Sequence, residues 1–252
     1  MGDRWIAFGG WAVSPAVLTP LFRDPPLLID VNEIAPSLVR NGRLRPDWET
    51  VVADHVKVLS NDRLPGIAGW STGSIMAYAA AQRLKPKVAM FLGATPSFCR
   101  RPGFPYGWKP AALKAMREKL ETDPHGILHA FCERCGIALP LPATLPAASP
   151  PNPLSTSPRS PLPRGEGNGK TIENSGNTEA IKRPLIDGLH FLEQASLIPV
   201  APLPCPSLFM HGREDAIVPF QAGKMFADAA GGRFLEYDGG HGFFVGREGF
   251  FY

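Results

Sequence analysis

The sequence predicts an α/β domain in which a mostly parallel central sheet is flanked by helices. Short apolar runs of strand length alternate with helical segments along the chain, an order typical of parallel sheets. The run at 88–93 is apolar throughout, as expected for a strand buried on both faces. With 252 residues, of which 44% are hydrophobic, the chain can bury one sizeable core. We therefore expect residues 1–252 to form a single domain.

Each expected element follows from its local composition. Apolar runs of strand length are bounded by turn residues, and helical segments are rich in helix formers. Asp47 stands where its side chain could cap the start of a helix. In chain order we expect strands at 6–8, 27–31, 64–69, 88–93, 207–210 and 234–237, and helices at 47–59, at 74–84 and near Phe220.

Residues 97–197 are expected to leave the sheet as a helical lid. Within them, 110–120 predicts an amphipathic helix, because Leu113, Met116 and Leu120 recur at i, i+3 and i+7. The segment 139–178 is dense in proline, serine, glycine and asparagine and cannot bury enough apolar surface to offset its ordering entropy. We expect it to be a disordered insertion. Its Pro-x-x-Pro pattern at 158–161 leaves open a polyproline ligand as the alternative.

The stretch Gly69-Trp-Ser-Thr-Gly73 matches the G-x-S-x-G nucleophile elbow, a strand-to-helix turn that exposes a serine hydroxyl. It lies between a predicted strand and a predicted helix, as an elbow must. Both glycines have a physical reason, since a β-carbon there would clash with the neighbouring strand and helix. Ser71 is thus a candidate nucleophile. The alternative is an ordinary turn with a surface serine.

Two further residues complete a candidate triad in the chain order serine, acid, histidine. Asp215 lies in an acidic turn after a predicted buried strand, and His241 lies in a glycine-rich loop after the next strand. In this hypothesis His241 takes the Ser71 proton, while Asp215 orients the imidazole and stabilises its charged form. Glu214 and Asp238 compete for the acid role. We expect Glu214 to face solvent or pair with an adjacent arginine, and Asp238 to cap its turn.

An acyl-transfer site also needs two amide donors for the oxyanion. The residue after the nucleophile supplies one donor, here Thr72, and the glycine loop after the first strand supplies the other, here Trp11. The alternative for the Trp11 side chain is a core or lid-facing aromatic. That placement is compatible with its amide serving the oxyanion hole.

These motifs resemble the α/β-hydrolase superfamily and, within it, the pimeloyl-acyl-carrier-protein methyl ester esterases of biotin synthesis. The segments 94–98, 107–113 and 187–192 extend the resemblance into the lid. It implies an α/β-hydrolase fold and a serine carboxylesterase that releases methanol from a pimeloyl chain on acyl carrier protein, with no cofactor and no metal. It further implies a substrate channel lined by Trp11, Phe98, Trp108 and Met116. The sequence departs from the family at Gly9, where histidine is usual, and at Ser74, where glycine is common.

The charge of the chain bears on partners. A net charge of +3, without a basic stripe carrying interleaved aromatics, argues against nucleic acid. Lys114, Arg117 and Lys119 crowd the predicted lid helix, with further basic residues just before it. They are either a solvated helix face or a docking face for acyl carrier protein, because opposite charge speeds encounter and orients the partner.

The remaining expectations concern the setting and the competing functions. No apolar run is long enough to span a bilayer and no signal peptide opens the chain, so we expect a cytoplasmic enzyme whose four cysteines are reduced. We expect it to act as a monomer. If their segment is helical, His125 and Cys135 are too far apart to share one zinc ion with His129 and Cys132, which leaves a smaller site of three of these residues, or one completed by a partner, as the alternative. Two functional alternatives stay open: a general short-chain carboxylesterase or thioesterase, and an inactive binding protein on the same scaffold.

Overall fold

A computed structural model describes residues 5–60, 64–137 and 175–247. Its main sheet has six strands in the order β2-β1-β5-β6-β7-β8, and all five neighbouring pairs are parallel. The prediction of an α/β fold with a parallel sheet is therefore confirmed. The strands are β1 (Ile6–Phe8), β2 (Leu27–Ile29), β5 (Gly66–Trp70), β6 (Val88–Leu92), β7 (Ser207–Gly212) and β8 (Arg233–Tyr237).

The central strands β5 and β6 are almost wholly buried, because helices cover the sheet. Four aromatic residues join the sheet to α3 (Thr72–Leu84) and α7 (Phe220–Ala230). Tyr78 of α3 and Phe91 of β6 both contact Phe226 of α7, which also meets Phe209 of β7 edge-on at 5.1 Å between ring centroids. Burying each ring stabilises the fold by roughly 1.5–3 kcal/mol. This core holds the carboxyl ends of β5, β6 and β7 in place, where the candidate site lies.

One helix in the first half of the chain was not expected. The predicted strand at 27–31 ends at Ile29, because Asp30 caps α1 (Val31–Leu38) by accepting a hydrogen bond from the Asn32 amide. Pro36 within this helix masks its helical pattern. The helix predicted at 47–59 is α2 (Trp48–Ser60), and Asp47 directly precedes it, but the Asp47 carboxylate pairs with the guanidinium of Arg45.

The other described elements are short. A 3-10 helix, η1 (Pro15–Leu21), follows β1, and a two-stranded antiparallel ribbon of β3 (Val39–Arg40) and β4 (Arg43–Leu44) follows α1. Within the described ranges, no helix is both long enough and apolar enough to cross a membrane.

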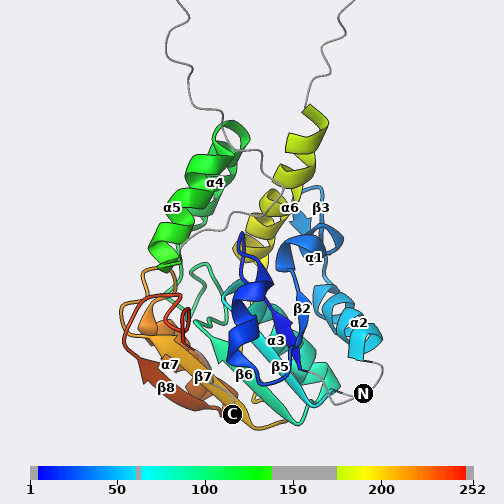
Figure 1. Cartoon of the computed structure of the whole chain (residues 1–252), viewed down its shortest axis with the longest axis vertical. Helices are drawn as coiled ribbons and strands as arrows, with labels where there is room; N and C mark the ends of the chain where they lie inside the picture. The colour runs from blue at the N-terminus through cyan, green and yellow to red at the C-terminus, as the bar shows by residue number, and fades with distance from the viewer. Residues whose placement is uncertain (1–4, 61–63, 138–174, 248–252) are drawn as a thin grey trace, which may run out of the picture.

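Three helices in the described residues between β6 and β7 are here called the lid helices. They are α4 (Pro110–Thr122), α5 (Pro124–Cys135) and α6 (Ser175–Gln194). Figure 1 shows them together at one end of the molecule, and α4 packs against both α5 and α6. The predicted disordered segment 139–178 overlaps α6 at 175–178, which corrects its boundary. The rest of it, including the Pro-x-x-Pro pattern, lies outside the described residues.

Candidate active site

Ser71 occupies the turn between β5 and α3 with a φ of 56° and a ψ of −122°, a strained conformation for a residue with a side chain. The two flanking glycines make this turn possible. A Cβ on Gly69 would overlap the Gly73 carbonyl oxygen, and a Cβ on Gly73 would overlap the Gly9 carbonyl oxygen. The structure thus bears out the steric reason predicted for both glycines. Ser74 Oγ donates to the Ser71 carbonyl at 2.5 Å and braces the same turn.

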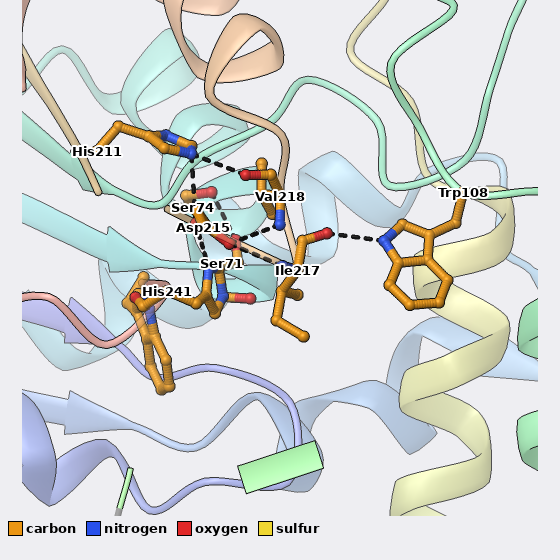
Figure 2. A network of polar contacts seen from close by, with 9 residues as sticks. Ser71, Ser74, Trp108, His211, Asp215, Ile217, Val218 and His241 are labelled. Carbon is orange, nitrogen blue, oxygen red and sulfur yellow. Dashed lines mark hydrogen bonds and ion pairs between the residues drawn. The ribbon is translucent and has the colours of Figure 1, made fainter. Parts of the chain in front are cut away.

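Asp215 and His241 form a buried pair although 26 residues separate them. Asp215 lies in the loop after β7, and its Oδ2 is 2.7 Å from His241 Nδ1 in the loop after β8. Asp215 Oδ1 accepts hydrogen bonds from the amides of Ile217 and Val218, both at 2.8 Å. Both side chains of the pair are fully buried. The acid is therefore held by its own loop while it faces the histidine (Figure 2).

The ionisation of Asp215 follows from these contacts. Burial alone would raise the pKa of its carboxyl group, because a charge is costly away from water. The charge of His241 and the hydrogen bonds from His211 and His241 outweigh burial and hold this pKa below its usual range. Asp215 is thus a carboxylate at neutral pH, as a triad acid must be.

The His241 loop is held by three other parts of the chain. The Trp70 indole, next to Ser71 in sequence, donates to the His241 carbonyl at 3.1 Å, and the Gly242 amide donates to the Cys135 carbonyl of α5 at 2.8 Å. Gly93, after β6, leaves room for the imidazole: a Cβ there would lie 2.9 Å from its Cε1 and Nδ1. These contacts bring His241 to the elbow side of the sheet.

Ser71 and His241 are enclosed, with relative exposures of 4% and 0%. Within the described residues, His241 Nε2 makes no hydrogen bond, so the base is not hydrogen-bonded to the Ser71 hydroxyl. Such contacts are often long without substrate and tighten in the reacting complex. The arrangement leaves the nitrogen that would take the serine proton unengaged by any other described group.

Of the two predicted oxyanion donors, one lies in the elbow and the other in the loop after β1. Thr72 is the first residue of α3, whose first amides have no partner inside the helix. Trp11 lies in the loop after β1 and is 1% exposed; its indole donates to the Leu185 carbonyl of α6 at 2.9 Å. In the described part of the chain, neither backbone amide donates to a protein acceptor. Both are therefore available to a bound oxyanion.

An apolar cavity of about 120 Å³ lies between the lid helices and the sheet. All four residues predicted to line a substrate channel line this cavity: Trp11, Phe98, Trp108 and Met116. Its other lining residues are Leu113, Ile127, Ala130, Phe131, Arg134, Leu189, Leu192 and Ile217. Trp108 joins the cavity to the acid loop, because its indole donates to the Ile217 carbonyl at 2.7 Å (Figure 2).

The surroundings of the two competing acidic residues confirm the expectation for Glu214 and correct the one for Asp238. Glu214 is exposed, as expected, but it does not pair with Arg213; its Oε2 accepts from the Gly239 amide at 2.5 Å. Asp238 pairs with Arg213 at 2.5 Å rather than capping its own turn. The two side chains thus brace the Asp215 loop against the His241 loop from outside. Neither contacts His241, whereas Asp215 does.

The basic residues of α4 differ in their surroundings. Arg117 is only 14% exposed and pairs with Glu193 of α6 at 2.5 Å, so it faces the lid interior instead of solvent. Lys114 lies 3.8 Å from Glu118 and, like Lys119, is exposed. Of the three predicted docking residues, Arg117 is therefore a structural contact between lid helices.

The histidines and cysteines of α5 do not gather. Cys132 and Cys135 are buried, whereas His129 lies on the exposed side near Glu133. In the ranges that the structure describes, no group of three or more histidine, cysteine or acidic side chains is arranged to hold a metal ion.

Sequence reasoning missed His211 and Gly93. His211 is the fifth residue of β7 and lies 3.3 Å from Asp215 Oδ2. A histidine at the end of a buried strand, four residues before the acid, was a signal that could have identified it. Gly93 carried a weaker signal, as a glycine directly after the strand next to the elbow strand.

Comparison with known proteins agrees with this architecture. The sequence pattern of the alpha/beta hydrolase family matches residues 7–250. A comparison with curated proteins found no match. An esterase from Exiguobacterium antarcticum is similar in structure, with a TM-score of 0.63, 18% identity and coverage of 97% of this chain and 87% of that one. At this identity the likeness shows the fold alone.

Two further solved structures are similar. An enol-lactonase from Burkholderia xenovorans LB400 has a TM-score of 0.61, 15% identity and coverage of 98% and 87%. The RedJ thioesterase of the prodiginine pathway in Streptomyces coelicolor has a TM-score of 0.50, 18% identity and coverage of 96% and 79%. The expected α/β-hydrolase fold is thereby confirmed.

Proposed function

Because the chain belongs to the alpha/beta hydrolase family, we propose that it is a serine carboxylic ester hydrolase. The observation that carries the proposal is the buried pair of Asp215 and His241, 2.7 Å apart, beside a serine held at positive φ in the elbow. A histidine oriented by a carboxylate can activate a serine hydroxyl, and a strained turn presents that hydroxyl to substrate.

The proposed reaction runs through an acyl-enzyme. Ser71 Oγ attacks the ester carbonyl while His241 Nε2 takes its proton, and the Trp11 and Thr72 amides hold the oxyanion. The tetrahedral intermediate collapses as His241 gives that proton to the departing alcohol. Water then attacks the acyl-enzyme, loses a proton to His241 and releases the acid, with Ser71 regaining its proton. Asp215 stabilises the charged imidazole in both halves.

The test is the Ser71→Ala variant assayed with a short p-nitrophenyl ester and a fluorophosphonate probe. We expect hydrolysis to fall by several orders of magnitude and labelling to vanish, while the fold persists. Ser37→Ala is the matched control, because Ser37 lies on α1 away from the elbow and its hydroxyl donates only to the Ile34 carbonyl of its own helix. Near-normal turnover by folded Ser71→Ala protein, or unlabelled wild type, would favour an inactive binding protein.

For the substrate, we propose a methyl-capped pimeloyl chain carried on acyl carrier protein, with release of methanol. The apolar cavity between the lid helices supports this proposal, because the transfer of a methylene chain from water into an apolar cavity is favourable. The competing proposal is a general short-chain esterase or a thioesterase; two structurally similar proteins are an esterase and a thioesterase. The comparison of kcat/KM for a carrier-bound methyl ester, the free methyl ester and an acyl thioester distinguishes the three.

The carrier-docking proposal now rests on Lys114 and Lys119, which are exposed. Reversing both to glutamate should raise KM for the carrier-bound ester and leave a small free ester unchanged, because surface charge steers the encounter over roughly a Debye length, ~8 Å at physiological salt. Arg117 is excluded from the variant, since its reversal would place two carboxylates together against α6. Equal KM values for both proteins on the carrier-bound ester would leave these lysines as a solvated face.

A further inference from the structure

We propose that His211 is a positioning residue for the acid of the triad: as the neutral Nε2–H tautomer, it locks the Asp215 carboxylate in the orientation that His241 needs. Only the expected effect of His211 on kcat rests on the proposed hydrolase function. Asp215 lies between two histidines, His211 from β7 and His241 from the loop after β8 (Figure 2).

The hydrogen-bond geometry defines the role of His211 Nε2. This nitrogen lies 2.9 Å from the Val218 carbonyl oxygen and 3.3 Å from Asp215 Oδ2. Both neighbours are acceptors, so Nε2 must carry a hydrogen and share it between them. A hydrogen bond to a charged acceptor is stronger than one between neutral groups. His211 therefore ties Asp215 to the backbone of its own loop.

The other ring nitrogen shows which tautomer is present. His211 Nδ1 is buried and has no hydrogen-bond partner among the described residues. A Cβ on Gly223 of α7 would overlap this nitrogen, so the helix backbone packs closely over it. A second N–H at Nδ1 would be a buried donor without an acceptor, and the ring would carry a charge. Both costs favour the neutral ring with its hydrogen on Nε2.

Together the contacts leave the carboxylate no freedom to turn. Asp215 Oδ1 accepts from the amides of Ile217 and Val218, and Oδ2 lies 2.7 Å from His241 Nδ1 and 3.3 Å from His211 Nε2. Three hydrogen bonds and the His211 contact thus surround a carboxylate that has roughly four lone-pair sites. Without His211, His241 would be the remaining side chain at Asp215 Oδ2 among the described residues. The carboxylate could then rotate and change the distance between Oδ2 and His241 Nδ1. His211 has its own support, because Phe220 and Phe234 pack on its ring.

The experiment compares His211→Leu with His211→Gln on a short free ester. Leucine keeps bulk without a donor, whereas glutamine keeps an N–H donor at similar reach. We expect His211→Leu to lower kcat on the order of tenfold with KM nearly unchanged, since a misplacement of ~1 Å costs about a hundredfold. His211→Gln should recover most of that loss. A purely structural role predicts no such rescue and no split between kcat and KM.

Two further measurements keep the proposal testable. Trp48→Leu removes a buried packing contact with Phe191 that does not involve His211 or Asp215, so it should lower the melting temperature but not kcat. Nitrogen-15 NMR of wild-type protein should show His211 with Nε2 protonated and Nδ1 unprotonated near neutral pH, a result that depends on no activity and holds even if the hydrolase proposal fails. Protonated Nδ1, or full kcat in folded His211→Leu protein, would overturn the inference; if that variant does not fold, the NMR result decides.

Discussion

Gly93→Ala tests whether the space beside the His241 imidazole is needed for turnover. The substitution has two separable costs. Gly93 has a φ of 51°, and an L-residue in that region costs about 1–2 kcal/mol of stability. The new Cβ would also lie 2.9 Å from the imidazole, which must retreat by roughly 0.5 Å to reach an ordinary 3.4 Å contact. Because a misplacement of ~1 Å costs about a hundredfold, we expect kcat to fall on the order of tenfold.

Gly231→Ala is the matched control for this prediction. Gly231 caps α7 with a φ of 72°, and a Cβ there meets nothing within 4 Å among the described residues. Both variants should lose similar stability in urea unfolding, but only Gly93→Ala should lose kcat on a short p-nitrophenyl ester. Equal kcat losses in the two variants, or unchanged kcat in Gly93→Ala, would refute the reasoning that this glycine makes room for His241.

Three other predictions follow from buried groups. Trp70→Phe removes the donor to the His241 carbonyl and should lower the free energy of unfolding in urea by about 1–3 kcal/mol. The pKa of Asp215 is lowered by folding, so its carboxylate stabilises the fold above the unfolded value of about 3.9 and loses that effect as pH falls through the folded value. The stability difference between wild type and Asp215→Asn should therefore narrow in acid. Burial raises the pKa of Cys99 to about 11, so iodoacetamide should alkylate half-exposed Cys205 long before Cys99, as mass spectrometry can follow.

The sequence alone determined the class of fold and the turns that carry the candidate chemistry. Apolar runs between turn residues located all six strands of the sheet to within a few residues. The Gly69 and Gly73 pair identified the elbow, because only glycine tolerates such close backbone approach. Chain order then selected Asp215 and His241. These are local features, and neighbouring residues encode them.

The tertiary structure decided which side chains meet. Arg117 could have faced solvent, yet α4 turns it toward Glu193 of α6. Glu214 bonds the Gly239 amide and Asp238 pairs with Arg213, because the distance between their two loops depends on the register of β7 and β8. His211 is only four residues from Asp215 in sequence, but Phe220 of α7 and Phe234 of β8 pack on its ring. Such pairings depend on how distant elements pack, and the composition around any one residue does not contain that information.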